Sequence, residues 1–390
     1  MISLVVIQPT SLCNINCNYC YVPDRKDKFI MSYELLETAI AKVLNNSLLS
    51  DSIEFLWHAG EPLTVGIPFY EKAVEFMKKH NRFGIKIHNT IQTNGIMLND
   101  KWCEFFRNND FQVGVSLDGP EFINDLNRVG WNGKSTHNKV MQGISYLKKH
   151  NIQFGIIGVL TMESLNYPKE VFDFFYQNEI FSVAFNVEEV ENANISSSLS
   201  GNVLDTEEII RKYENFIYVF YDLQQSHTPR VEVREFTEIL STIQNKISNQ
   251  NYQRVYTEAT DLAVLTIHKN GDISTYSPEF AGMKAEKYNN FIIGNIYNDE
   301  IDELYKNKFF LALQSDIHRS IKMCSETCLY FDFCGGASLS NKFSENGTLL
   351  STETMTCKLH VQSLSKVVID KLIVATENKA SQKTNGEIQY

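Results

Sequence analysis

The first twenty residues, MISLVVIQPTSLCNINCNYC, decide the fold, because an apolar run is followed there by three closely spaced cysteines. The run at 4–7 predicts a buried strand, since it is too short for a signal peptide and no basic segment precedes it. Cys13, Cys17 and Cys20 follow on one loop with the spacing CxxxCxxC. Three thiolates at this spacing can bind three irons of a cubane cluster. Because most electron-transfer clusters use four cysteines, the spacing predicts a cluster whose fourth iron is open to another ligand.

Composition limits the class of protein. The chain has 390 residues, of which 43% are hydrophobic and 12% aromatic, so it can bury a large core and is not disordered throughout. Its net charge of -11 and the lack of a basic stripe argue against a nucleic-acid binder. No apolar stretch approaches the roughly 20 residues of a transmembrane helix. Eight cysteines without a signal peptide indicate metal or redox chemistry in the cytoplasm rather than disulfides.

The pattern over residues 1–190 predicts six βα units. Apolar strand runs alternate with amphipathic helices, and the strands lack clean polar alternation, as expected of a parallel sheet covered by helices. The fold class is therefore α/β, with a partial (β/α)6 TIM-like barrel, and its chemistry should lie at the C-terminal ends of the strands. The strands are expected at 4–7, 53–57, 85–91, 111–116, 154–160 and 183–187, and the helices near 33–48, 69–79, 100–108, 137–149 and 168–178.

Beyond the six units the pattern is less regular. A polar break at 195–206 predicts a loop, and a further helix is expected near 206–225. We expect four segments along the chain: a barrel at 1–225, a bridge at 226–320, a second cysteine-rich domain at 321–376 and a loose polar tail at 377–390. Because the chain starts directly at the first predicted strand, we expect no fused leader-binding domain.

Polar residues follow several of the predicted strands. Gly60-Glu61-Pro62 comes after the second strand, where glycine permits close approach of the backbone to a ligand and proline fixes the turn. Asn94 ends the third strand and Ser116 the fourth, and Arg128 lies beyond the fourth. These positions predict ligand contacts. The alternatives are an ordinary turn at Asn94 and a surface position for Arg128.

Acidic residues at strand ends are candidates for catalysis. Glu188 and Glu189 follow the sixth strand, and Asp118 follows the fourth. A carboxylate in such a position can act as a general base. Neighbouring residues of a strand point to opposite faces, so at most one of Glu188 and Glu189 faces the cavity. A turn at Asp118 and a solvated surface at Glu188 and Glu189 are the alternatives.

A second set of cysteines lies near the C-terminus: Cys324, Cys328, Cys334 and Cys357. A tight triple with one distant fourth cysteine can bind a whole cubane cluster or a zinc ion. The remaining Cys103, next to Trp102 on a predicted helix, is expected to be a buried apolar residue.

The N-terminal motifs together resemble those of radical S-adenosylmethionine (SAM) enzymes. The resemblance rests on the three cysteines with Tyr19 before the last, and on Gly60-Glu61-Pro62, although Ala59 stands where the family usually has another glycine. It implies that Cys13, Cys17 and Cys20 hold the [4Fe-4S] cluster that reduces SAM. Tyr19, Gly60, Glu61 and Pro62 would contact SAM, with Gly60-Glu61-Pro62 at its amino group, and Asn94, Ser116 and Arg128 at its ribose or carboxylate.

The C-terminal cysteines resemble part of the SPASM extension of radical SAM enzymes that modify peptides. A full extension has seven cysteines and two auxiliary clusters, and the four cysteines here match the outer one. Tyr276 and Ser277 lie in the stretch where an inner-cluster pair would begin, and Ser338 replaces a further cysteine. The resemblance therefore implies one auxiliary [4Fe-4S] cluster, on Cys324, Cys328, Cys334 and Cys357.

A narrower resemblance is to the cyclophane-forming maturases of glycine-rich-repeat precursor peptides. It covers residues 4–375 and is most marked at 330–336 and 341–354. It implies a crosslink between an aromatic ring carbon and a side-chain β-carbon of a ribosomally made precursor peptide, with a flavodoxin or ferredoxin as electron donor. The alternatives are a sactipeptide, thioether or sulfatase-maturing SPASM enzyme, and, from another class, a zinc-stabilised peptide-binding scaffold.

Overall fold

A single open sheet organises the molecule. The computed structural model describes residues 1–200 and 205–386, with side chains up to residue 377. Within these residues the strands form one ten-stranded sheet in the order β10-β9-β8-β1-β2-β3-β4-β5-β6-β7. The neighbours from β8 to β7 run parallel, while β8, β9 and β10 pair antiparallel. The strands are β1 Ile2–Ile7, β2 Leu49–Trp57, β3 Lys86–Thr93, β4 Phe111–Ser116, β5 Phe154–Leu160, β6 Ser182–Val187, β7 Glu232–Val233, β8 Val264–Ile267, β9 Asp272–Thr275 and β10 Gly294–Asn295.

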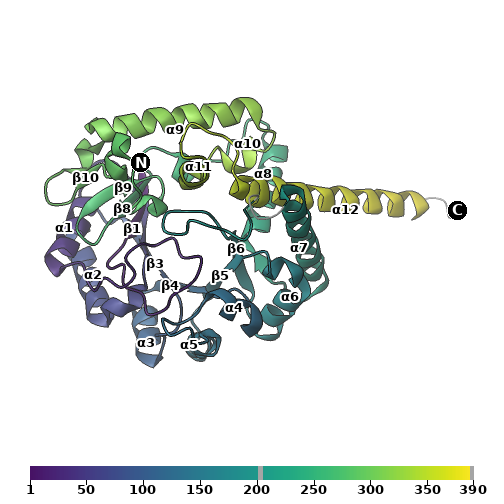
Figure 1. Cartoon of the computed structure of the whole chain (residues 1–390), viewed down its shortest axis with the longest axis horizontal. Helices are drawn as coiled ribbons and strands as arrows, with labels where there is room; N and C mark the ends of the chain where they lie inside the picture. Colours follow the sequence, from purple (N-terminus) through teal and green to yellow (C-terminus); the bar gives the residue numbers. More distant parts are fainter. Residues whose placement is uncertain (201–204, 387–390) are drawn as a thin grey trace.

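The helices that alternate with the parallel strands lie along the outer side of the curved sheet (Figure 1). Several begin at side-chain caps, which supply acceptors for the unpaired N–H groups of the first turn. Ser32 accepts from Leu35 N at the start of α1, and Asn99 accepts from Trp102 N at the start of α3. The helices are α1 Tyr33–Leu44, α2 Ile67–His80, α3 Asp100–Asn108, α4 Glu121–Asn127, α5 His137–Lys149, α6 Pro168–Gln177, α7 Thr206–Ser226, α8 Arg234–Ser248, α9 Lys308–Thr327, α10 Phe331–Cys334, α11 Leu339–Asn346 and α12 Leu364–Gly386.

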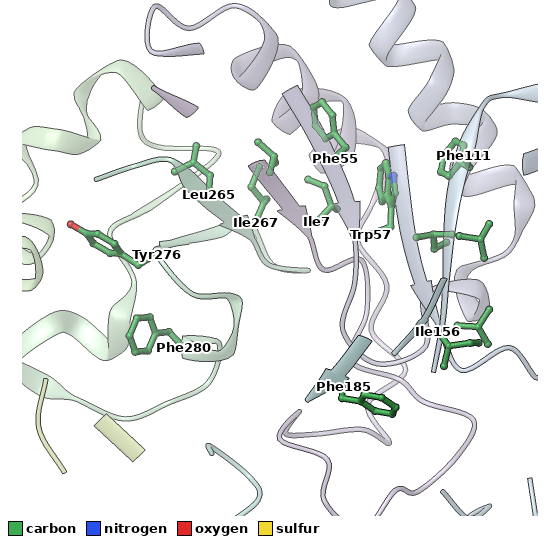
Figure 2. Close-up of a cluster of buried hydrophobic side chains, with 14 of the residues drawn as sticks. Ile7, Phe55, Trp57, Phe111, Ile156, Phe185, Leu265, Ile267, Tyr276 and Phe280 are labelled. Carbon is green, nitrogen blue, oxygen red and sulfur yellow. The ribbon is translucent and has the colours of Figure 1, made fainter. Parts of the chain in front are cut away.

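The core lies between the sheet and these helices. Phe55 and Trp57 of β2 are fully buried in it (Figure 2), and the Trp57 ring packs edge-on against Tyr70 of α2 with 5.2 Å between centroids. Burying a side chain of this size contributes about 1.5–3 kcal/mol. The same core continues to Phe280, beyond β9, so the barrel and the following segment share one interior. The expected fold class, an unclosed α/β barrel of six βα units, is confirmed.

The C-terminal half departs from the expectation in two places. Strands β8 to β10 come from the segment expected to be a bridge, yet they extend the barrel sheet at the β1 edge. Helix α12 continues to Gly386, through most of the stretch expected to be a loose tail, and extends past the rest of the fold (Figure 1). The buried Val367 and Val368 anchor the start of α12 near α7 and α8. The later, polar turns extend a helix that is already formed, which costs less than starting a new one. The last four residues of the expected tail, and residues 201–204 of the expected loop, lie outside the described residues.

Among the described helices, none combines the length and the apolar character needed to cross a membrane.

Candidate active site

The three N-terminal cysteines line one cavity at the C-terminal ends of the strands, here called the cluster cavity. Its volume is about 230 Å³. Hydrogen bonds hold the cysteine loop from two sides: Cys13 N donates to the carbonyl of Arg25 over 3.0 Å, and Asn16 N donates to that of Val129 over 2.7 Å. The loop is therefore held by the segment that follows it and by the segment around Val129, and the thiols of Cys13, Cys17 and Cys20 face a common space.

These thiols fit a cluster with one open iron. Thiols that each bind a different iron are spread around a cubane and need not converge on one point. In agreement, no three His, Cys, Asp or Glu side chains in the described part of the chain are grouped to hold a single metal ion. Burial raises the pKa of Cys13 to about 12 and that of Cys17 to about 11. Binding of cationic iron would therefore be coupled to loss of these thiol protons.

The turn after β2 packs directly on the cysteine loop. Gly60 lines the cluster cavity in a left-handed conformation with φ +50°, and a Cβ placed on it would lie 2.5 Å from the carbonyl oxygen of Leu12. Only glycine fits at this point. The preceding Ala59 also has a positive φ, of 71°, so the turn keeps its left-handed form at the position where the related motif has glycine.

Glu61 points into the protein rather than into the cluster cavity. Its fully buried carboxylate accepts hydrogen bonds from Leu63 N over 2.9 Å, from the Thr93 hydroxyl over 2.7 Å and from Asn94 N over 2.7 Å. Burial nevertheless raises its pKa to about 7. Pro62 starts the 3-10 helix Pro62–Val65 and lies outside the cavity lining. Glu61 thus joins the ends of β2 and β3, and of the predicted motif only Gly60 lines the cavity.

Asp118, Arg128 and Tyr19 form a buried network beneath the cysteines. Arg128 Nε bonds Asp118 Oδ1 over 2.9 Å, the Tyr19 hydroxyl donates to Asp118 Oδ2, and the guanidinium lies 5.4 Å from the centre of the Tyr19 ring. Val159 N also donates to Asp118 Oδ1, and Asp118 is only 2% exposed. Asp118 therefore holds Tyr19 and Arg128 in position, and its catalytic role stays a prediction. Tyr19 and Arg128 do line the cavity.

Asn94 and Ser116 also line the cluster cavity, at the ends of β3 and β4. Asn94 Nδ2 donates to Asn14 Oδ1 over 2.6 Å and lies 3.8 Å from the Cys13 sulfur. The Ser116 hydroxyl oxygen accepts from Gln92 Nε2 over 3.0 Å. Their contacts with SAM, like those of Tyr19, Gly60 and Arg128, stay predictions.

Three glutamates, here called the acidic trio, meet at the wall of the cluster cavity: Glu189, Glu191 and Glu279. Burial, together with the charge of the neighbouring carboxylates, raises the pKa of Glu189 and of Glu191. Glu191 is 3% exposed, and its Oε1 has no hydrogen-bond partner in the described structure. Glu279 accepts from the Ser277 hydroxyl, and burial raises its pKa as well.

The trio adds two residues to the predicted candidate acids. Glu188 lines the cavity, and its Oε2 accepts from the backbone N–H and the hydroxyl of Ser198. The catalytic roles of Glu188 and Glu189 stay predictions. Glu191 and Glu279 were missed by the sequence analysis. For Glu191 a signal existed, because it lies two residues after Glu189, whereas Glu279 comes from the segment after β9, where the chain pattern gives no signal.

The four C-terminal cysteines line a second cavity of about 270 Å³. Cys324 and Cys328 come from the end of α9, Cys334 ends α10, and Cys357 opens the π-helix Cys357–Ser363. Burial raises the pKa of the Cys357 thiol to about 12. Four thiols around one cavity fit a fully ligated cubane.

A buried lysine stands beside these cysteines. Lys342 is 2% exposed, and its ammonium donates to the Cys324 sulfur over 3.3 Å, to the Ser320 hydroxyl over 2.9 Å and to the carbonyl of Gly336 over 3.0 Å. A buried cation next to thiolates offsets the negative charge of a bound cluster.

Two polar residues of the stretch expected to begin an inner-cluster pair are hydrogen-bonded. Tyr276 is fully buried, and its hydroxyl donates to Asp261 Oδ1 over 2.6 Å. The Ser277 hydroxyl donates to Glu279, and Ser338 immediately precedes α11. Cys103 is fully buried in the core of the barrel, as the sequence predicted.

Comparison with known proteins identifies the family. The model of the Radical SAM superfamily matches residues 7–175. An uncharacterized protein of Synechocystis sp. is 36% identical over 376 residues, covering 95% of this chain and 92% of its own. The serine-type anaerobic sulfatase-maturating enzyme of Bacteroides thetaiotaomicron is 31% identical over 359 residues, covering 87% and 83%. The solved structure of native anSMEcpe with bound AdoMet and Kp18Cys peptide is 25% identical, covers 96% of this chain and 99% of its own, and has a TM-score of 0.78.

The chain therefore belongs to the radical SAM superfamily, in the branch that contains the anaerobic sulfatase-maturating enzymes. Its cofactors are SAM and iron–sulfur clusters. Cys13, Cys17 and Cys20 are the residues that would hold the SAM-binding cluster, and the four C-terminal cysteines those that would hold an auxiliary cluster.

Proposed function

We propose that this protein is a maturase that oxidises the side-chain β-carbon of a residue in a peptide or protein substrate. One observation carries the proposal: a single cavity brings the three cysteines of an open cluster together with three buried carboxylates. When bound, SAM and its cluster supply a carbon radical able to remove a hydrogen atom from an unactivated carbon. The chain's own residues must then hold the substrate, exclude water and take up a proton.

The substrate has a route to the cluster cavity. A cavity of about 460 Å³, distinct from the one at the C-terminal cysteines, adjoins the cluster cavity. Tyr21, Val22 and Ala59 line both it and the cluster cavity. Ligand sites commonly have volumes of about 300–1,000 Å³, so this space is large enough for a short peptide segment. We infer that the segment enters there and places its reacting side chain past Tyr21.

The acidic trio is the proposed proton acceptor. Oxidation of the β-carbon by two electrons releases one hydrogen atom, one further electron and one proton. Glu189, Glu191 and Glu279 lie at the cavity wall, and the free Oε1 of Glu191 can accept a proton without breaking an existing hydrogen bond. Burial raises the pKa of all three, and repulsion by neighbouring carboxylates adds to this at Glu189 and Glu191, so an ionised member is more basic than an exposed glutamate.

The auxiliary cluster that the C-terminal cysteines would hold is the proposed acceptor of the second electron. Lys342 would favour the reduced state of a cluster on them, because its positive charge lies next to Cys324. We therefore expect this cluster to accept an electron from the substrate radical.

The first candidate product is an aldehyde formed from a serine or cysteine side chain. Named relatives are sulfatase-maturating enzymes of serine type and of cysteine type, and they align over most of this chain. Two-electron oxidation of a serine β-carbon that bears a hydroxyl gives an aldehyde. The comparisons support this candidate at least as well as the crosslink favoured by the sequence motifs.

The second candidate product is a cyclophane, in which the β-carbon radical adds to an aromatic ring. It is favoured by the sequence resemblance at 330–336 and by the lack of cysteines in the stretch 270–277, where an inner-cluster pair would begin, and at Ser338. The same proton and electron acceptors serve both candidates.

Mass spectrometry of substrate peptides separates the two. The reconstituted protein, SAM and dithionite are incubated with a serine-containing sulfatase peptide and with the peptide encoded beside this chain's gene. Serine oxidation and crosslinking each remove about 2 Da, since two hydrogens leave the peptide. Only the aldehyde reacts with a hydrazide, and only the crosslink resists backbone fragmentation between the joined residues. Deuterium at the target β-carbon should appear in 5′-deoxyadenosine, and label that stays in the peptide would refute the proposal.

Cysteine variants provide the matched controls. Replacing Cys13, Cys17 and Cys20 by Ala should leave about four irons of eight and abolish SAM cleavage. Cys334→Ala should lose the other four irons and the product, while SAM cleavage continues in part.

A further inference from the structure

The surface next to the cysteine loop is basic, although the chain as a whole has a net charge of -11. Arg25, Lys26, Trp131 and Lys134 form this surface, here called the basic face. Lys26 Nζ lies 4.5 Å from the centre of the Trp131 ring, and the Arg25 guanidinium lies 5.6 Å from it. Lys134 is exposed on the same turn as Trp131, which is closed by a hydrogen bond from Gly130 N to the Lys134 carbonyl.

The basic face contacts the cysteine loop directly. Trp131 is 40% exposed, yet its Nε1 donates to the carbonyl oxygen of Cys13 over 2.9 Å. Arg25 Nη1 donates to the carbonyl oxygen of Cys17 over 3.1 Å. The Trp131 side chain therefore links the solvent to the backbone of Cys13, and the Arg25 side chain contacts that of Cys17. Both cysteines would hold the SAM-binding cluster.

Nearby carboxylates offset this charge only in part. Asp27 is paired with Lys269, whereas Asp125 stays ionised, because its partial burial is outweighed by hydrogen bonds from Ser135 and Thr136, which hold its pKa below the usual range. Asp24 and Asp125 are therefore the acidic residues that face the cations of Arg25, Lys26, Lys28 and Lys134. A positive face on an acidic protein attracts an acidic partner in one orientation, because every other orientation brings like charges together.

We propose that the basic face is the docking site of an acidic electron-carrier protein of the flavodoxin type. The proposal rests on the proposed function, which requires one electron for each SAM cleaved. In the step the carrier is oxidised by one electron and the cluster on Cys13, Cys17 and Cys20 is reduced by one electron, with no bond formed or broken between the proteins. Trp131 is the contact through which the carrier reaches the cysteine loop.

A charge-reversal pair tests the docking. Lys26→Glu with Lys134→Glu removes two cations of the basic face and leaves Arg25 and Trp131, which bond the cysteine carbonyls, in place. The control is Lys78→Glu with Lys86→Glu, which makes the same change of net charge at two exposed sites. Lys86 begins β3 and Lys78 lies in the last turn of α2, which precedes β3, whereas the cysteine loop follows the end of the parallel strand β1. Both control sites are therefore at the other end of the strands from the cysteine loop.

Binding is measured first, by calorimetry with a purified oxidised bacterial flavodoxin at low and at moderate salt. The basic-face variant should bind at least about tenfold more weakly than wild type and lose most of the salt dependence, whereas the control should bind like wild type. Cluster reduction by flavodoxin hydroquinone, followed by electron paramagnetic resonance, should slow in parallel. Reduction by dithionite, which needs no docking site, should be unchanged.

Wild-type binding by the basic-face variant, or equal loss in the control, would overturn the docking site. Failure of the proposed function has a different signature, because wild-type protein would then bind flavodoxin but not cleave SAM with either reductant.

Discussion

Gly60→Ala should weaken both the fold and the cluster site, because the new methyl group has no room. Its Cβ would lie 2.5 Å from Leu12 O and 2.8 Å from Ser11 O, so the cysteine loop must retreat by about 0.9 Å to restore an ordinary contact of 3.4 Å. A left-handed non-glycine residue costs about 1–2 kcal/mol, and forced overpacking about 1–3 kcal/mol. Restriction of the unfolded chain offsets about 0.4–1 kcal/mol, leaving about 2–4 kcal/mol of net destabilisation.

Gly84→Ala isolates the contribution of the backbone. Gly84 has a similar φ of +65°, but no atom lies within 4 Å of the position its Cβ would take. Anaerobic urea unfolding and iron analysis are compared for wild type and both variants. Gly84→Ala should lose at most about 1 kcal/mol and keep its iron, whereas Gly60→Ala should lose about 1–3 kcal/mol more and bind less iron at the N-terminal site. If the two variants unfold alike with equal iron, the close packing of Gly60 on the cysteine loop is not what the site requires.

Three further predictions concern charged residues. Arg128→Ala should lower the free energy of unfolding by about 3–5 kcal/mol, because it leaves the buried Asp118 without its cation, and Asp118→Asn in the same chain should restore part of this in urea titrations. Lys342→Met should lower the midpoint potential of the auxiliary cluster in a redox titration and reduce peptide product more than 5′-deoxyadenosine, whereas Lys342→Arg, which keeps the charge, should do so less. Product formation should rise with pH through about 7, because a proton acceptor must be ionised and burial raises the pKa of Glu189 to about 7, and the rise should weaken in Glu189→Gln while SAM cleavage persists.

The six βα units were predictable because apolar stretches alternate along the chain with amphipathic helical patterns. Residues 111–116 and 154–160, for example, are the strands β4 and β5 as expected. Local sequence is sufficient there, because parallel strands covered by helices are apolar on both faces. Strands β8 to β10 are two to four residues long, and their place beside β1 is set by tertiary pairing, which no local pattern indicates.

The candidate site likewise has a part that the sequence predicted and a part that it did not. Cysteine spacing predicted both sets of cysteines lining common cavities, since ligands of one cluster must be close in space. The sequence did not show that Glu61 and Asp118 are turned inward to bond N–H, hydroxyl or guanidinium groups, because side-chain direction at a turn depends on which donors surround it. Glu279 joins Glu189 only through the packing of the segment after β9 against the barrel.

The pairing of β1 with β8 has a consequence for synthesis of the chain. β1 meets β2 within the first 57 residues, but its other edge is covered only by Val264–Ile267. Until residue 267 has left the ribosome, that edge offers unpaired N–H and C=O groups to any other extended chain. One edge of the first strand is thus sheltered only after β2 to β7 have been made, and a message cut short before Val264 would yield a self-associating fragment rather than a smaller working barrel.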